Sequence, residues 1–193
     1  FIKFFEMVKK NTCVFISGQG TNLKNLILYS RNNNFPIKIC LVISSNKKAK
    51  GLNFAKKFNI PSVYIDTQRR NYESKILLNL RKYNISFICL AGYMKIITGK
   101  VLKNYRKNII NIHPSLLPKF KGLNTYYRML KNREKKAGCT VHYVNEKLDS
   151  GSTIIQKSFF INDKDDEINL KTKTQKLEQR AFPQAIIKIF RDN

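Results

Sequence analysis

Short hydrophobic runs alternate with amphipathic stretches along the first two thirds of the chain. The runs are rich in β-branched and aromatic side chains, which is typical of buried strands. They predict five strands over Thr12–Ser17, Ile37–Ile43, Val63–Ile65, Phe87–Leu90 and Ile109–Ile112. Hydrophobic positions at near-helical spacing predict helices over residues 21–30, 51–58, 69–83 and 101–105, with Thr21 or Asn22 capping the first.

The pattern changes after Gly122. A helix is predicted near residues 124–132, followed by two β-rich runs, Cys139–Val144 and Thr153–Ile161, and by a closing helix over residues 168–190 that Pro183 interrupts. Alternating strands and helices predict an α/β fold with a mostly parallel central sheet, helices on both faces and late antiparallel strands. No linker divides the chain, so we expect one domain over residues 1–193.

Net charge is the most unusual feature of the composition. The chain has 37 Lys and Arg against 12 Asp and Glu, a net charge of +25, which suits an anionic partner, but its richness in Lys, Asn and Ile, which share AT-rich codons, makes genome composition the stronger explanation. The lysines are spread along the whole chain, and no arginine-rich run or aromatic-spaced basic motif occurs. We therefore expect a small phosphorylated ligand rather than a specific nucleic acid.

Other features exclude further classes. The longest apolar stretch, Ile85–Met94, is about half of the roughly 20 residues that a membrane span needs. The first ten residues lack the apolar core of a secretory leader, so we expect a cytoplasmic protein. The cysteines are too dispersed for a metal knuckle and are expected to be reduced core thiols: Cys13, Cys40, Cys89 and Cys139.

The first candidate site is the loop Gly18–Asn22, between a predicted strand and a helix. Its backbone amides and the helix N-terminus can meet an anion. Leu23 occupies the place of the third glycine in the dinucleotide fingerprint, so a mononucleotide or sugar phosphate fits better. An ordinary tight turn is the alternative interpretation.

The second candidate site follows the fifth predicted strand. Alternation along an extended chain places Asn111 and His113 on one side. An amide and an imidazole in one space supply an oxyanion donor and a proton shuttle. The other histidine, His142, is expected to have a structural role or to contact the site residues without contacting the ligand. A zinc site has little support, because the chain has only two histidines and no carboxylate stands beside them at ligand spacing.

The third candidate is the turn Leu148–Gly151, which contains Asp149. A carboxylate on a fixed turn can orient a histidine and stabilise its protonated form, although an Asx-turn is the simpler interpretation. No covalent nucleophile stands out, because Ser115 lacks the Gly-x-Ser-x-Gly elbow. The residues thus favour direct transfer between two bound substrates.

Together these three clusters resemble the glycinamide ribonucleotide formyltransferase family, the folate-dependent enzymes of purine synthesis. The resemblance covers nearly the whole chain. It runs through Val14–Asn22, Leu90–Met94, the Asn-x-His-Pro-Ser-Leu-Leu-Pro string from Asn111 to Pro118, Val141–Val144 and Leu148–Gly151. It implies a Rossmann-like formyltransferase fold, a phosphate-binding half over about residues 12–110 and a catalytic and folate-binding part over about residues 111–193.

The resemblance also implies roles for individual residues. The catalytic set would be Asn111, His113 and Asp149. Substrate-binding residues would be Gly20, Thr21, Asn22 and Arg69 at the phosphate, with Gln175 and Glu178 at the ribose and glycinamide. The folate pocket would be lined, largely through backbone groups, by Met94, Lys95, Ile96, Ile97, Asn145, Glu146, Lys147 and Leu148. Lys95 stands where the family often has Arg. Lysine lacks the planar, bidentate geometry with which arginine binds a carboxylate.

The implied reaction is attack of the glycinamide amine on the formyl carbon of 10-formyltetrahydrofolate. Asn111 and protonated His113 would stabilise the oxyanion, with Asp149 favouring that protonated form. No metal, membrane or specific nucleic acid is expected, and the protein would be a monomer or a homodimer. The alternatives are a formyltetrahydrofolate deformylase, a methionyl-tRNA formyltransferase, both of which usually have longer chains, and a non-catalytic basic nucleic-acid-binding module.

Overall fold

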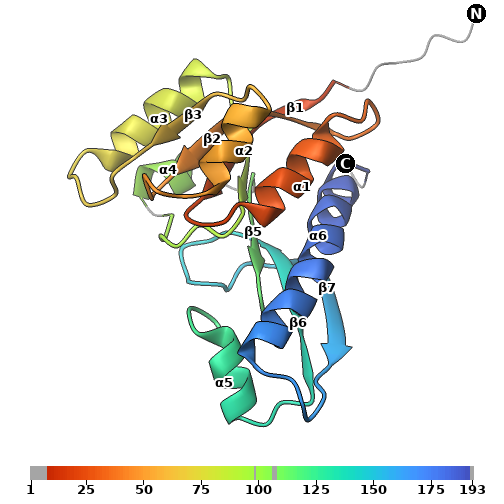
Figure 1. Cartoon of the computed structure of the whole chain (residues 1–193). Helices are drawn as coiled ribbons and strands as arrows, with labels where there is room; N and C mark the ends of the chain where they lie inside the picture. The colour runs from red at the N-terminus through yellow and green to blue at the C-terminus, as the bar shows by residue number, and fades with distance from the viewer. Residues whose placement is uncertain (1–7, 98, 106–107, 192–193) are drawn as a thin grey trace, which may run out of the picture.

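The computed structural model describes residues 8–97, 99–105 and 108–191. Residues 1–7, on which part of the prediction about a secretory leader depends, lie outside the described part. One seven-stranded sheet runs through the molecule in the order β3-β2-β1-β4-β5-β6-β7 (Figure 1). The strands are β1 (Lys10–Ile16), β2 (Ile37–Ser44), β3 (Ser62–Tyr64), β4 (Phe87–Leu90), β5 (Ile109–His113), β6 (Lys136–Tyr143) and β7 (Thr153–Phe160).

Strand directions confirm the predicted mostly parallel sheet with late antiparallel strands. The first five strands pair in parallel, whereas β6 is antiparallel to β5 and β7 is antiparallel to β6. The helices are α1 (Thr21–Ser30), α2 (Gly51–Lys57), α3 (Tyr72–Lys82), α4 (Gly99–Asn104), α5 (Thr125–Lys131) and α6 (Glu167–Arg191). In the described part of the chain, no helix is long and apolar enough to cross a membrane.

Alternate residues of the strands feed two cores on opposite faces of the sheet. On one face, Val14, Ile110 and Val141 pack with side chains of α1, α2 and α6. On the other face, Phe15 and Ile109 pack with α3 and α4. Helices therefore cover both faces, as the strand and helix alternation predicts.

Two glycines join the first two βα units at the carboxyl ends of their strands. Gly20 has φ +77° and directly precedes α1, and Gly51 begins α2. A Cβ on Gly20 would lie 2.4 Å from the Gly51 Cα, so neither helix start has room for a side chain there. The predicted cap at Thr21 or Asn22 is wrong: Gly20 is the N-cap, and no side chain caps the helix.

The predicted break at Pro183 is wrong, because α6 continues through it. Proline lacks the N–H that would bond to the Gln179 carbonyl, four residues earlier. Asn25 of α1 donates its Nδ2 to that carbonyl at 2.6 Å, so the carbonyl keeps a partner. Packing of α1 against α6 thus compensates for the missing helix bond, which the sequence of α6 alone does not show.

The starts of two elements differ most from the prediction. The third helix begins at Tyr72 rather than residue 69, because Asp66 accepts the Gln68 N–H and holds a turn there. Strand β6 begins before Gly138, where a Cβ would lie 2.0 Å from the Lys157 carbonyl of β7. That glycine permits close strand approach and does not end the strand.

The cysteines are free, as expected, but they are not all in the core. Cys13, Cys89 and Cys139 are buried, whereas Cys40 is half-buried on β2. The prediction of core thiols is therefore right for three of the four.

Candidate active site

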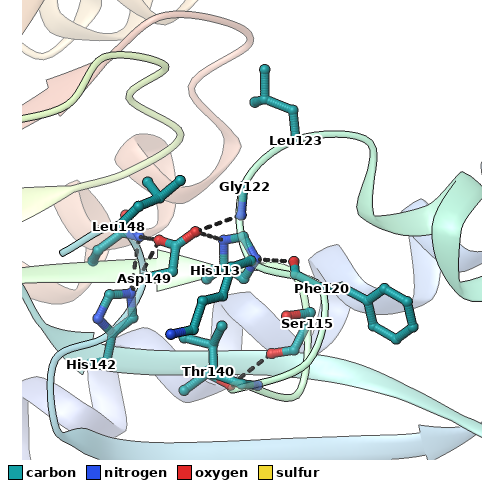
Figure 2. Close-up of polar contacts among 12 residues, drawn as sticks. His113, Ser115, Phe120, Gly122, Leu123, Thr140, His142, Leu148 and Asp149 are labelled. Atoms are coloured by element: carbon teal, nitrogen blue, oxygen red, sulfur yellow. Dashed lines mark hydrogen bonds and ion pairs between the residues drawn. The ribbon is translucent and has the colours of Figure 1, made fainter.

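Strand β5 positions Asn111 and His113 on one face of the sheet. Their neighbours Ile110 and Ile112 point into the core covered by α6, so the two polar side chains point the opposite way. The antiparallel register places Asn111 opposite His142. At this end of the sheet the polar face is covered by the segments around Phe120–Leu123 and Leu148–Asp149, which Figure 2 shows closing over His113.

His113 is buried between two acceptors. Its Nε2 lies 2.9 Å from the Phe120 carbonyl oxygen, and its Nδ1 lies 3.3 Å from Asp149 Oδ2 (Figure 2). Since a carbonyl can only accept, Nε2 carries the proton and donates it to Phe120. Nδ1 of the neutral ring then presents a lone pair to the carboxylate, so Nδ1 is the atom at which the ring can receive a proton.

Burial lowers the pKa of His113 below its usual value of 6.5. The Phe120 carbonyl and the Asp149 carboxylate both favour the protonated ring, but they offset the effect of burial only in part. The ring is therefore neutral at pH 7 in the protein without substrates. The charge of Asp149 does favour a protonated His113, as its position on a turn predicts, without making that form dominant.

Asp149 holds the site together from a strained turn. Its backbone has φ +45°, an uncommon conformation for a residue with a side chain. Oδ2 accepts the Gly122 N–H at 2.9 Å, and Oδ1 lies 3.5 Å from Asn111 Nδ2. Burial alone would raise the pKa of Asp149, but contacts with His142, Gly122 and His113 outweigh it and lower that pKa. Asp149 is thus an ionised carboxylate at neutral pH.

His142 orients Asn111. Its Nδ1 lies 2.8 Å from the Tyr143 carbonyl oxygen, so that nitrogen carries the proton and Nε2 is an acceptor. Asn111 donates its Nδ2 to that Nε2 at 3.2 Å. The amide group of Asn111 is therefore held through both Nδ2 hydrogens, and the longer bond, 3.5 Å to Asp149 Oδ1, is the one that an incoming oxyanion can replace.

A pocket of about 70 Å³ opens beside this set. It contains most of the side chains that the resemblance assigns to folate: Lys95, Ile96, Ile97, Asn145, Lys147 and Leu148, together with Asn111 and Asp149. An adjoining cavity of about 770 Å³ shares Val144, Asn145 and Lys147 with it and includes Glu146. Met94 lines neither; its backbone N–H donates to Ser17 Oγ at 2.8 Å and its side chain is exposed.

The loop before α1 has unused backbone donors. The helix bonds begin with the Lys24 N–H to the Gly20 carbonyl at 2.9 Å, so the preceding amides, including that of Thr21, have no acceptor within the helix. No side chain caps this end. An anion can therefore bind here to backbone N–H groups and to the positive end of the helix dipole.

Asn22 and Glu178 contact each other although 156 positions separate them. Asn22 donates its Nδ2 to Glu178 Oε2 at 2.8 Å, and both side chains are buried. Burial raises the pKa of Glu178 to about 7, and the Asn22 hydrogen bond only moderates that shift. The Oδ1 atom of Asn22 is buried with no hydrogen-bond partner, so this pair retains an unused acceptor.

Replacing Glu178 with glutamine is expected to stabilise the protein at pH 8 more than at pH 5. The folded state raises the pKa of this carboxyl from 4.5 to about 7, so its contribution to stability is complete below pH 4.5 and declines as pH rises through about 7. The full difference is roughly 3 kcal/mol. Urea unfolding of the wild type and Glu178→Gln at both pH values measures it. The exposed Glu167→Gln change on the same helix is the matched control, and equal differences for both variants would contradict the prediction.

The remaining candidates lie apart from these groups. Arg69 is in the turn after β3, where its side chain is 70% exposed and lies 3.6 Å from Asp66. Gln175 is half-buried on α6, one turn before Glu178. Across residues 8–97, 99–105 and 108–191, no group of three or more His, Cys, Asp or Glu side chains could hold a metal ion.

Sequence reasoning missed some groups that complete the site. The Phe120 carbonyl and the Gly122 N–H fix His113 and Asp149, yet backbone groups leave no trace in side-chain patterns. His142 lines the pocket as well as holding Asn111. Its position opposite Asn111 follows from the antiparallel pairing of β5 with β6, and because α5 separates these strands along the chain, no local pattern shows that pairing.

Comparison with known proteins gives a consistent result. The formyl transferase family model matches residues 10–186. The phosphoribosylglycinamide formyltransferase of Haemophilus influenzae is 38% identical over 184 residues, which cover 92% of this chain and 85% of that protein. The trifunctional purine biosynthetic protein adenosine-3 of Drosophila melanogaster is 37% identical over 95% of this chain, which spans only 14% of that relative's length.

A solved structure agrees with these sequence matches. The crystal structure of phosphoribosylglycinamide formyltransferase from Bacillus halodurans superposes with a TM-score of 0.89 and 34% identity, covering 93% of this chain and 95% of that one. Matches of this extent include both the sheet and the residues around the site. The chain therefore belongs to the formyl transferase family, and within it to the phosphoribosylglycinamide formyltransferases.

Proposed function

We propose that this protein transfers the formyl group of 10-formyltetrahydrofolate to the amine of glycinamide ribonucleotide. The observation that carries the proposal is the catalytic set itself: His113 lies 3.3 Å from Asp149, with Asn111 on the same strand face beside an open pocket. An oxyanion donor, a proton acceptor and an ionised carboxylate are the groups that formyl transfer to an amine requires.

The two pockets beside Asp149 would receive the folate. Ile96, Ile97 and Leu148 supply apolar walls suited to a flat ring system, and the backbone of residues 94–97 and 145–149 supplies hydrogen-bonding groups for its edge. Glycinamide ribonucleotide would approach from the other side, with its phosphate on the amides that precede α1 and its ribose toward Gln175 and Glu178. Formyl carbon and amine then meet at the carboxyl end of β5.

The amine attacks the formyl carbon, a new C–N bond forms, and negative charge develops on the formyl oxygen. Asn111 stabilises this charge with the Nδ2 hydrogen that it otherwise donates to Asp149 Oδ1 over the longer distance, 3.5 Å against 3.2 Å to His142. His113 takes the proton of the attacking amine at Nδ1, where Asp149 stabilises the imidazolium. The same proton passes to N10 as the N10–C bond breaks, directly or through a water held by Asp149.

Both nitrogens of His113 already have partners, which sets a geometric requirement. The contact to Asp149 is longer than the one to Phe120, 3.3 Å against 2.9 Å. We infer that the ring shifts slightly when substrates bind, so that Nδ1 reaches the amine while Nε2 stays on the Phe120 carbonyl and the Asp149 carboxylate stays near enough to stabilise the imidazolium by its charge. The Phe120 carbonyl thereby keeps the ring in one orientation throughout the transfer.

A spectroscopic assay of folate deformylation, with and without glycinamide ribonucleotide, tests this function. We expect turnover that requires the amine and yields one formylated product for each folate consumed. Deformylation without the amine would indicate a hydrolase, and formylation of methionyl-tRNA in place of the ribonucleotide would indicate the tRNA enzyme. Size-exclusion chromatography in the same buffer tests the predicted monomer or homodimer.

A further inference from the structure

The segment between β2 and α2, residues 45–50, lies against the proposed phosphate loop. Gly51 donates its N–H to the Gly18 carbonyl at 3.0 Å, and Asn46 donates its Nδ2 to the Ser17 carbonyl at 3.2 Å. The hydroxyl groups of Ser17 and Ser45 are 2.7 Å apart. These contacts fix one loop to the other, so charges on residues 45–50 stay beside the phosphate loop.

Three lysines stand on this segment, and a fourth reaches the same place from α1. Lys47, Lys48 and Lys50 are exposed. The ammonium group of Lys24 lies 5.7 Å from the centre of the Phe54 ring, and an edge of that ring is 3.4 Å from the Cβ position of Gly20. We call Lys24, Lys47, Lys48 and Lys50 the lysine group.

The phosphate loop itself has no cation. Residues 17–22 contain no Lys or Arg, whereas a phosphate monoester carries nearly two negative charges at neutral pH. Residues 8–65 contain ten Lys or Arg and no Asp or Glu, so no carboxylate of these two βα units opposes the lysine group. Within the described part of the chain, none of the four ammonium groups forms a salt bridge or a hydrogen bond.

Two acidic groups that follow these units or pack against them have partners of their own. Asp66 after β3 lies 3.6 Å from the guanidinium of Arg69. Glu178 of α6 is buried beside Asn22, where burial raises the pKa of its carboxyl to about 7. In these two βα units, therefore, the four lysines add positive charge beside the phosphate loop and no carboxylate of the same units opposes it.

We propose that the lysine group draws the phosphorylated substrate to the phosphate loop and selects it over the same molecule without phosphate. The proposal rests on the proposed function and adds the source of positive charge that the backbone amides lack. Charges within about 10 Å act strongly at ordinary ionic strength, and clustered charges of one sign raise both association rate and affinity for a counter-ion. The effect must weaken as salt is added.

The test compares two quadruple variants that lose equal charge. The first is Lys24→Gln, Lys47→Gln, Lys48→Gln and Lys50→Gln. The control is Lys38→Gln, Lys56→Gln, Lys57→Gln and Lys75→Gln, all exposed and away from the loop contacts. Calorimetry measures the Kd of glycinamide ribonucleotide at low and high salt, and circular dichroism verifies that each variant is folded.

We expect the first variant to bind about tenfold more weakly than the wild type at low salt, the control to bind within about twofold, and all three to converge at high salt. The dephosphorylated amine should bind all three proteins equally. Equal weakening in both variants would show that only net charge matters and would overturn the proposal, as would no weakening in the first. Amine-dependent turnover with no lysine effect would overturn this proposal alone, whereas no binding by the wild type would overturn the proposed function and this inference together.

Discussion

His113→Ala is expected to lower kcat for formyl transfer by about 10³-fold, or roughly 4 kcal/mol in the activation barrier. Nδ1 of His113 can accept a proton 3.3 Å from the ionised carboxylate of Asp149, whereas Nε2 of His142 lies farther from that carboxylate, at 3.7 Å, and holds Asn111. Alanine also leaves the Phe120 carbonyl and Asp149 without their shared partner. Asn111 keeps its own contact to His142, so part of the oxyanion stabilisation survives and some turnover remains.

Steady-state kinetics of the purified variant, with calorimetric binding of both substrates, measures this effect. Substrate affinities should change far less than kcat, because His113 does not itself line the pocket and reaches it only through Asp149. Addition of imidazole offers a second readout, since a free base that enters the vacated space should restore part of the rate. A variant that binds both substrates and turns over within about tenfold of the wild type would exclude His113 as the proton carrier.

Asp149→Asn is expected to lower kcat by about 10²- to 10³-fold and to lower the pKa of His113 further. Burial already lowers that pKa, and the charge of Asp149 is one of the groups that limit the shift. A neutral amide removes this effect while it keeps an oxygen for the Gly122 N–H. The imidazolium formed during transfer is then less stable, although the fold of the turn is retained.

The pH dependence distinguishes this role from a structural one. In the variant, the imidazole titration followed by nuclear magnetic resonance should move to lower pH than in the wild type, as should the acid limb of kcat. Asp66→Asn, which removes a half-buried carboxylate from another loop, is the matched control. A large loss of rate with an unchanged His113 titration would mean that Asp149 acts only by holding the turn.

The local chemistry of the site could be predicted from sequence because neighbours along a strand fix it. Asn111 and His113 share a face by alternation alone. Asp149 contacts His113, 36 positions away, because the segment after β6 folds back over β5. From the sequence, only the resemblance to the family places these two residues in one site. The Asn22–Glu178 contact depends on α1 packing against α6 over 156 positions, which no local pattern encodes.

The errors have the same origin. Pro183 lies within α6 because Asn25 of another helix satisfies the Gln179 carbonyl, and a pattern read along one segment cannot include a partner from elsewhere. The run predicted from Cys139 begins before Gly138, because this glycine lets β7 approach and so continues the strand. In both cases the tertiary neighbour decides what the residue does.

The close contact of Gly20 with Gly51 has a consequence for how substrate affinity can change in evolution. A methyl group at either position would push the starts of α1 and α2 apart, because the Gly20 Cβ site lies 2.4 Å from a backbone atom. Spreading the two starts would move the amides before α1 away from the lysines before α2. A side chain at this junction would not contact the ligand. It could nevertheless change the phosphate affinity of the proposed site, because it would alter the spacing between the groups that bind the phosphate and not the groups themselves.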